Sequence, residues 1–232
     1  MSKAYLRIDD SPSKITPDFV DYLSEKGIKP VVFAIGEKIE KYFDQAVYAV
    51  QKGAVVGNHS FSHKSFSKIS FDECKKEIEK CEIMLDKLYS MAKVERKYKI
   101  FAFPYGDKGG ENKTLLQSYF KSNGFCRLND EAIGFDWYKQ YDLHKDADAF
   151  WTFDFAEYLL PRENGYTYES ILERIHDKSP KTGGALLEDG SNHIVMIHDH
   201  EQTDSFMPEY YKTILDYVID CGVEFIEPKF VY

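Results

Sequence analysis

The sequence has few cysteines, no long hydrophobic run and no surplus of positive charge. Four cysteines in 232 residues are too few and too scattered for a disulfide framework, so a buried core must stabilise the fold. The longest apolar run, Val31 to Ile35, is far too short to cross a bilayer, and the N-terminus lacks the hydrophobic region of a signal peptide. We therefore expect no membrane span, and the sequence as given favours a cytoplasmic protein unless a leader has been removed.

The charge balance is acidic, with 30 Lys and Arg against 39 Asp and Glu and a net charge of -9. Such a chain receives no general electrostatic attraction from DNA, RNA or anionic lipid, so we expect no nucleic-acid partner. Hydrophobic residues make up 43% of the chain, which is enough for a sizeable core and excludes disorder as a description of the whole. No linker rich in Gly, Ser or Pro divides the sequence and no repeat is evident, so residues 1–232 are expected to form one domain.

Short β-rich segments alternate with amphipathic helical segments, which predicts an α/β fold around a largely parallel sheet. Residues 124–145 fit no regular strand–helix unit, and we interpret them as an excursion from the repeating α/β pattern. In the helix expected around residues 70–88, Cys74 and Cys81 occupy an apolar stripe and are expected to be buried thiols. The expected strands are 4–8, 29–36, 54–56, 99–103, 149–155, 193–197 and 223–226, and the expected helices are 16–26, 39–50, 70–88, 114–121 and 211–218.

Polar side chains gather just after four of the expected strands. In α/β sheets and barrels, ligands bind beyond the carboxyl ends of the strands, so four such clusters indicate one functional edge. They are Asp9-Asp10, His59 to His63, Pro104-Tyr105-Gly106, and His198-Asp199-His200.

The first two clusters contain the donors of a metal site. His59 and His63 are four residues apart, a spacing that lets two imidazoles converge on one ion, although two surface histidines often show the same spacing. A carboxylate from Asp9 or Asp10 would complete a set of two histidines and one carboxylate, which leaves open positions for water and substrate. The Asp9-Asp10 pair also fits a solvated turn introduced by Ser11-Pro12.

Among the remaining histidines, His198 has the best position for proton transfer, because the preceding strand delivers it to the functional edge. His193 precedes that strand and His200 lies further into the loop, so both are expected to be less well placed. His144 and His176 are interpreted as ordinary surface residues.

Three motifs resemble those of the polysaccharide deacetylase family, also called the NodB-homology domain or carbohydrate esterase family 4. Leu6 to Pro12 is similar to the first motif, Gly57 to His63 to the second and Ile194 to Asp199 to the fifth. The resemblance implies that Asp9 is the catalytic base and His198 the general acid. It also implies a divalent metal, with zinc favoured over cobalt, nickel and manganese, held by Asp10, His59 and His63.

The third and fourth motifs depart from the family pattern. In Phe101 to Gly106, Ala102 stands where many members carry an Arg that holds the fourth-motif Asp and helps to orient the base. In Trp151 to Tyr158, the fourth-motif Asp is Asp154, and Glu157-Tyr158 replaces the common Asp-Trp. By analogy, the backbone N–H of Tyr105, next to Pro104, stabilises the oxyanion.

The resemblance implies a distorted (β/α) barrel with fewer than eight regular units. It also implies hydrolysis of N-acetyl or O-acetyl groups on a saccharide substrate by attack of metal-bound water. A carbohydrate-binding barrel that has lost turnover is the alternative that Ala102 motivates. A non-haem iron oxygenase would use the same ligand set, but the alternation of strands and helices speaks against it. The sequence leaves the identity of the saccharide and the oligomeric state open.

Overall fold

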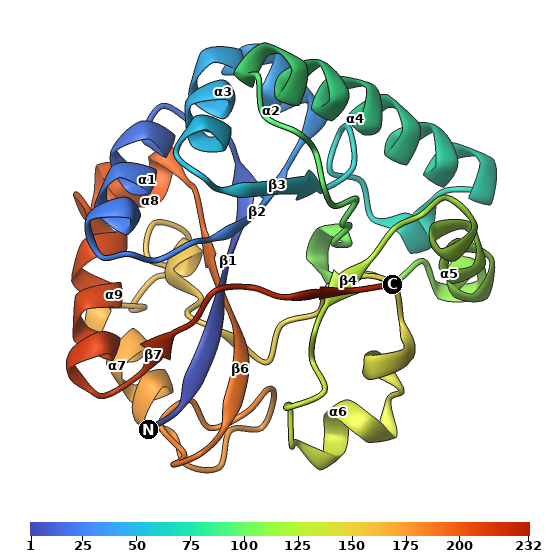
Figure 1. The fold of residues 1–232 in the computed structure, drawn as a ribbon. Coiled ribbons are helices and arrows are strands. Elements are labelled where there is room, and N and C mark those ends of the chain that lie inside the picture. The colour runs from blue at the N-terminus through green and yellow to red at the C-terminus, as the bar shows by residue number, and fades with distance from the viewer.

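The central strand of the fold is β1 (Lys3–Ser11), and the computed structural model describes all residues, 1–232. Strand β2 (Val31–Ala34) and strand β6 (Asn192–His198) pair with β1 in parallel on its two sides. In this register Asp9 lies opposite His198, which brings the first and last of the four polar clusters together. Figure 1 shows β1 and β6 side by side through the centre of the molecule.

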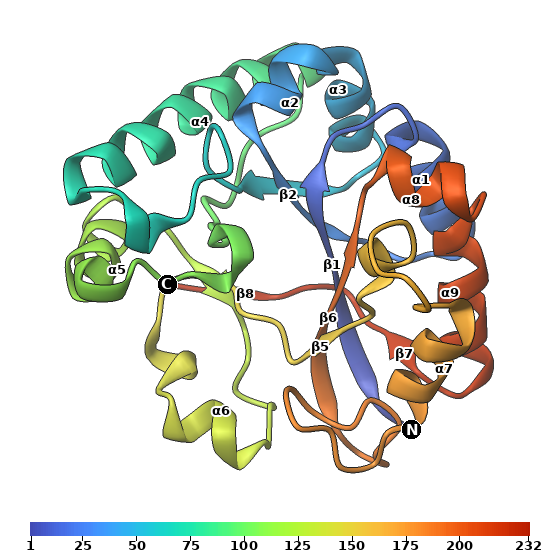
Figure 2. The same cartoon turned by 180° about the vertical axis from the view of Figure 1, so that it is seen from behind.

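The main sheet has six strands, with the order β3-β2-β1-β6-β5 and a further short strand on β1. Strand β3 (Val55–Asn58) continues the parallel sheet beyond β2, and β5 (Phe153–Asp154) lies beside β6 (Figure 2). Strand β7 (Glu224–Phe225) pairs with the beginning of β1. Within the predicted excursion, β4 (Arg127–Leu128) forms a separate antiparallel pair with β8 (Phe230–Val231).

The wall of the barrel between β3 and β5 consists of extended backbone without regular strands. Asn58 N donates to Ile100 O at 2.9 Å, Ala102 N donates to Asn58 O at 3.0 Å, and Ala149 N donates to Phe101 O at 2.8 Å. The strand expected over 99–103 is therefore reduced to isolated bridges, and the one expected over 149–155 is reduced to β5. Each segment pairs with its neighbour only briefly before it turns away. The expectation of a distorted barrel with fewer than eight regular units is confirmed.

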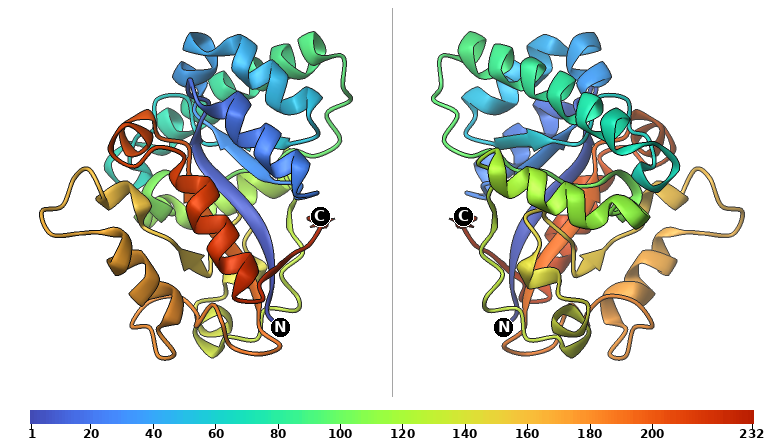
Figure 3. Two further views of the ribbon diagram at one scale, coloured as in Figure 1. Left: turned by 90° about the vertical axis from the view of Figure 1, so that its left-hand side faces the viewer. Right: turned by 90° about the vertical axis from the view of Figure 1, so that its right-hand side faces the viewer.

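The helices surround the strands. Helices α1 and α9 lie on one side of the molecule and α4 and α5 on the other (Figure 3). The helix expected over 39–50 is divided, because the backbone of Tyr42 leaves the helical region with φ -123° and ψ 48°. The helices are α1 (Thr16–Glu25), α2 (Gly36–Lys41), α3 (Phe43–Gln51), α4 (Phe71–Ala92), α5 (Lys113–Ser122), α6 (Asp136–Gln140), α7 (Tyr168–His176), α8 (Glu201–Phe206) and α9 (Tyr210–Asp220).

Helix α4 follows the sequence pattern closely. Ser70 caps its N-terminus and exchanges hydrogen bonds with Glu73 in a capping box. Cys74 and Cys81 are fully buried on its inner face, as expected, whereas Cys221 at the end of α9 is exposed. None of the helices combines the length and the apolar character that a bilayer crossing requires.

Candidate active site

The four polar clusters line one cavity at the carboxyl ends of the strands. Its volume is about 220 Å³, and it opens to solvent beyond β1 and β6. The neighbouring β strands deliver these residues to one edge because they run parallel and end at the same level. The lining residues are Asp9, Asp10, His59, His63, Tyr105, Gly106, Trp151, Asp154, Tyr158, Arg162, Met196, His198 and His200.

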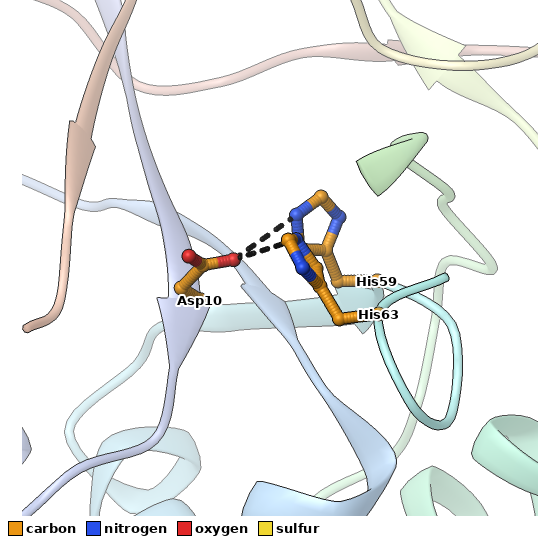
Figure 4. A group of neighbouring side chains, drawn as sticks. All are labelled: Asp10, His59 and His63. Carbon is orange, nitrogen blue, oxygen red and sulfur yellow. Dashed lines mark ion pairs between the residues drawn. The ribbon is translucent and has the colours of Figure 1, made fainter. Parts of the chain in front are cut away.

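Asp10, His59 and His63 point their ligand atoms at one another (Figure 4). Oδ1 of Asp10 lies 3.0 Å from Nε2 of His63 and 3.4 Å from Nε2 of His59. Donors bound to one tetrahedral zinc ion lie about 3.4 Å apart, given bond lengths near 2.1 Å. Oδ1 of Asp10 is also buried and accepts no hydrogen bond from the protein. These three residues therefore fit a divalent metal ion.

The protein fixes the orientation of these ligands. Nδ1 of His59 hydrogen-bonds the carbonyl oxygen of Ala102 at 2.8 Å, so Nδ1 carries the proton and the Nε2 lone pair faces Asp10. Burial disfavours a charged carboxylate, but the three imidazoles around Asp10 outweigh this effect and hold the pKa of Asp10 well below its usual value. Asp10 is therefore ionised, as a metal ligand must be.

The loop after β3 has a tightly held backbone. Ser60 and His63 adopt the left-handed region, with φ of 64° and 55°. The side chain of Asn58 accepts from Ser60 N at 2.8 Å and donates to Ile78 O at 2.9 Å, which ties the loop to α4. The hydroxyl of Ser60 in turn accepts from His63 N at 3.0 Å. These bonds hold a backbone that non-glycine residues rarely adopt.

The third imidazole beside Asp10 belongs to His200, which contradicts the expectation that His200 is poorly placed. Its Nε2 lies 2.8 Å from Oδ2 of Asp10, and its ring stacks on that of His198 with centroids 5.1 Å apart. Because β1 and β6 pair in register as far as Asp9 and His198, the residues just beyond that pair, Asp10 and His200, come close together. The sequence does not display this register, so it could not show that His200 reaches Asp10.

Asp9 is held by Arg7, which lies within the first motif but has no role among the predictions from the sequence. Nε of Arg7 donates to Oδ1 of Asp9 at 2.6 Å, and a terminal nitrogen donates to Oδ2 at 2.5 Å. Residues two apart on a strand share a face, so the spacing itself was the available signal. Burial raises the pKa of Asp9, but the Arg7 guanidinium together with His59 and His198 outweighs burial, so the pKa of Asp9 is lowered.

The guanidinium of Arg7 contacts two members of the core cluster that contains Ala102. It is fully buried, lies 4.8 Å above the ring of Phe33, and donates to the carbonyl oxygen of Ala149 at 2.8 Å. Phe33, Ala102 and Ala149 belong to the same core cluster. A guanidinium therefore contacts the carboxylate of Asp9 although the third motif carries Ala102, because β1 itself supplies Arg7 two residues before Asp9.

His198 is held by Glu157, which the sequence singled out only as a departure from the fourth motif. Oε1 of Glu157 accepts from the backbone N of His198 at 2.6 Å and lies 3.0 Å from its Nδ1. Burial lowers the pKa of His198, but the charges of Glu157, Asp154 and Asp10 outweigh this effect and raise the pKa to about 10. Burial also raises the pKa of Asp154, to about 6. Asp154 and Glu157 come within 4.8 Å of His198 and form an acidic support around it.

Tyr105 lies at the rim of the cavity. Its side chain is 71% exposed and its ring contacts His63, with centroids 4.5 Å apart. It follows buried Pro104 in a tight turn with φ of 59°, and its backbone N–H donates to no acceptor in the protein. That free N–H is compatible with the predicted oxyanion role.

Asp199 joins the loops that follow β1 and β6. It is buried and accepts hydrogen bonds from Ser11 Oγ at 2.9 Å, Ser13 Oγ at 2.5 Å and Thr16 Oγ1 at 2.5 Å. Its backbone N also donates to Asp9 O at 2.9 Å. This contact fixes the segment that presents Asp9 to the cavity.

Three histidines lie outside the cavity. His193 is buried at the opposite end of β6, between Thr152 Oγ1 at 3.1 Å and Ser191 Oγ at 2.8 Å. His144 and His176 do not line the cavity either. The expectation that His193 is less well placed than His198 agrees with its position, and His176 is exposed as expected of a surface residue, whereas His144 is half-buried.

Comparisons with known proteins match this chain to one family. A family model described as "Polysaccharide deacetylase" matches residues 2–124. A peptidoglycan-N-acetylglucosamine deacetylase of Bacillus cereus is 33% identical over 103 residues, which are 44% of this chain and 36% of that relative. The chain thus spans about a third of the length of that curated relative, and the extension of one domain over residues 1–232 stays a prediction.

Two solved structures show the fold. The polysaccharide deacetylase Bc1974 from Bacillus cereus has a TM-score of 0.62 at 21% identity, over 97% of this chain and 90% of that one. Wild-type BA3943 from Bacillus anthracis, described as a pseudoenzyme of family CE4, has a TM-score of 0.58 at 18% identity, over 97% of this chain and 63% of that one. At such identities the similarity establishes the architecture alone.

Proposed function

The chain belongs to the polysaccharide deacetylase family, and on that premise we propose that it is a metal-dependent hydrolase that removes N-acetyl or O-acetyl groups from a carbohydrate. One observation carries the proposal: three metal-ligand atoms, the Arg7-bound carboxylate of Asp9 and the Glu157-bound imidazole of His198 meet at one cavity. Amide hydrolysis requires an acidified water, a base and a proton donor for the departing amine.

Asp10, His59 and His63 are the proposed metal ligands. Zinc is the first choice for this set, and cobalt, nickel and manganese also accept such nitrogen and oxygen donors. When bound there, the ion would polarise the acetyl carbonyl and acidify a water molecule. The unpartnered Oδ1 of Asp10 and the fixed tautomer of His59 support this assignment.

Asp9 is the proposed general base. The Arg7 guanidinium keeps its carboxylate ionised and fixes its orientation through two hydrogen bonds. Oδ2 of Asp9 lies 3.5 Å from Nε2 of His59, so the base stands directly beside the ligand cluster. From that position it can take a proton from the water that attacks the carbonyl carbon.

His198 is the proposed general acid. Its Nδ1 is engaged by Glu157, which leaves Nε2 to serve the cavity, and its raised pKa keeps the ring protonated at neutral pH. It would donate its proton to the departing nitrogen, so that acetate and an amino sugar are released. The free N–H of Tyr105 would stabilise the developing oxyanion.

An acetate-release assay tests the proposal. Purified protein would be stripped of metal, reloaded with zinc, cobalt, nickel or manganese, and offered N-acetylglucosamine oligomers, nucleotide sugars and acetylated xylan. We expect His59→Ala to abolish metal uptake, Asp9→Asn to retain metal but lose about 100-fold or more in turnover, and the exposed control His176→Ala to resemble the wild type. A full rate in Asp9→Asn would refute the base assignment.

A carbohydrate-binding protein without turnover is the second candidate. The pseudoenzyme among the similar structures and Ala102 in the third motif favour it. The Arg7–Asp9 pair opposes it, because a guanidinium contacts the base despite Ala102. Saccharide binding without acetate release for any metal or substrate of the panel would establish this second candidate.

A further inference from the structure

A second and larger cavity adjoins the candidate active site. Its volume is about 920 Å³, and its lining shares Gly106, Trp151, Asp154 and Tyr158 with the cavity around Asp10. Gly106 has φ of 64°, and a Cβ there would lie 2.4 Å from the ring of Trp151, so glycine is what allows Trp151 to lie against this turn. We call the two connected cavities the groove.

The five arginines of the chain fall into two groups. Arg7, Arg96 and Arg127 each form an ion pair with a carboxylate. Arg162 and Arg174 form no ion pair, and both line the groove: Arg162 borders the active-site cavity and Arg174 the larger one. In a chain with a net charge of -9, two unpaired guanidinium groups at one groove indicate a ligand of opposite charge.

The guanidinium of Arg174 is oriented by the protein. Its Nε donates to the carbonyl oxygen of Asp154 at 2.9 Å, and its terminal nitrogens have no partner in the protein. The guanidinium of Arg162 lies 5.6 Å from the ring centroid of Tyr158. A planar guanidinium with free terminal nitrogens binds carboxylate or phosphate oxygens through paired hydrogen bonds.

The other charged groups of the larger cavity leave this preference in place. Lys108 is engaged by Asp146 and Asp148, whereas Lys181 is exposed and forms no ion pair. Asp154 is the one carboxylate that lines the larger cavity, whereas Asp9 and Asp10, which also line the active-site cavity, face Arg7 and the proposed metal site. Cationic groups are thus the ones available to a ligand.

Besides the two unpaired arginines, aromatic side chains line the groove. Trp151 and Tyr158 line both cavities, and Tyr141, 69% exposed, lines the larger one. The Arg7 guanidinium and the ring of Phe150 lie against the ring of Trp151, but the exposed ring of Tyr141 and the half-buried ring of Tyr158 can offer apolar contact to the C–H face of a sugar ring. Together with the free guanidinium groups, they match a sugar that carries a negative charge.

We propose that the groove binds a saccharide residue bearing a carboxylate or a phosphate, next to the acetylated residue at the Asp10 cluster. The proposal rests on the proposed deacetylase function and adds the charge of the substrate to it. A neutral acetylated oligomer would leave Arg162 and Arg174 without partners.

Calorimetric binding to zinc-loaded Asp9→Asn protein, which should retain the metal but lose turnover, tests this proposal with three oligosaccharides of equal length and acetylation. One is neutral, one carries carboxylates and one carries phosphate monoesters. We expect one of the charged ligands to bind about 10-fold more tightly than the neutral one, and Arg162→Gln or Arg174→Gln to remove that preference. Binding of the neutral oligomer should persist in both variants and reports intact folding. The control Lys121→Gln removes an equal charge on α5, outside the groove, and should change nothing.

Equal affinity for neutral and charged oligomers, or an equal loss in Lys121→Gln, would overturn the proposal. Acetate release by protein that retains Asp9, measured in parallel, separates the two proposals. Release from all three oligomers with equal kcat/KM would refute the charged subsite and leave the deacetylase standing. Arg174-dependent binding of a charged oligomer without any acetate release would refute the deacetylase and retain the subsite.

Discussion

Nε2 of His200 lies 2.8 Å from Oδ2 of Asp10, while Oδ1 of the same carboxylate faces the ring nitrogens of His59 and His63. The two oxygens of Asp10 are thereby assigned different partners. A hydrogen bond to the second oxygen restrains the carboxylate and leaves the first for a metal ion.

The first prediction follows from this contact. His200→Ala should weaken zinc binding about 10- to 100-fold, because Asp10 would lose the hydrogen bond that restrains it. Competition with a chromophoric chelator measures the affinity directly. His176→Ala, which alters an exposed histidine on α7, should leave the affinity unchanged. Wild-type affinity in His200→Ala would show that the contact has no such role.

The second prediction concerns the ion pair of Arg7 and Asp9. Arg7→Ala leaves a buried carboxylate without its partner and should destabilise the fold by about 3–5 kcal/mol. Burial then raises the pKa of Asp9 with only His59 and His198 left to oppose it, so the acidic limb of the pH–rate profile should move to higher pH. Urea unfolding and acetate release against pH measure the two effects.

A variant that introduces an arginine at position 102, where many family members carry one, provides the matching control. Arg7→Ala combined with Ala102→Arg should recover part of the lost turnover, because Ala102 and Phe33, over which the Arg7 guanidinium lies, belong to one core cluster. Zinc uptake should persist in both variants, since Asp10, His59 and His63 are intact. If turnover of Arg7→Ala equals that of the wild type, the ion pair does not serve the base.

The third prediction concerns Glu157. The Glu157 carboxylate helps to raise the pKa of His198 to about 10, against the effect of burial. Glu157→Gln should therefore lower the pKa of His198, so that the ring loses its proton at lower pH. Because the general acid must be protonated, the alkaline limb of the pH–rate profile should move down by about one pH unit or more. An unchanged alkaline limb would remove His198 from the role of acid.

The fourth prediction concerns stability in acid. Burial lowers the pKa of His193 to about 4, so the folded state binds a proton less readily than the unfolded state, whose pKa is near 6.5. The stabilisation is complete above pH 6.5 and is lost as the pH falls toward 4, by up to about 1.4 kcal/mol per pH unit. Urea unfolding between pH 4 and 7 should show this slope, and His193→Gln should reduce it. Equal slopes in both proteins would contradict the prediction.

The metal-ligand set could be predicted from the sequence because short motifs carry it. His59 and His63 lie in one loop, and Asp10 follows a strand whose apolar pattern is clear. Parallel strands end at one edge of the sheet, so the prediction of a parallel α/β fold was enough to predict that these motifs lie close together.

The supporting contacts depend on strand register, which the sequence does not display. His200 reaches Asp10 because β1 and β6 pair with Asp9 opposite His198. Glu157 reaches His198 across 41 positions of the chain, and neither residue alone signals the other. The segments around residues 100 and 150 carry the apolar pattern of strands, but tertiary packing lets them pair only at isolated positions.

The irregular wall between β3 and β5 has a consequence for motion. Single amide bonds from Asn58, Ala102 and Ala149 hold it together, whereas β1 and β6 share a continuous ladder. A protein opens locally where its backbone hydrogen bonds are fewest, so the amide hydrogens of this wall should exchange with solvent before those of β1. The carbonyl of Ala102 fixes the imidazole of His59, so each opening of this wall would also release that ring. The rate of opening would then limit how quickly a bound ion escapes.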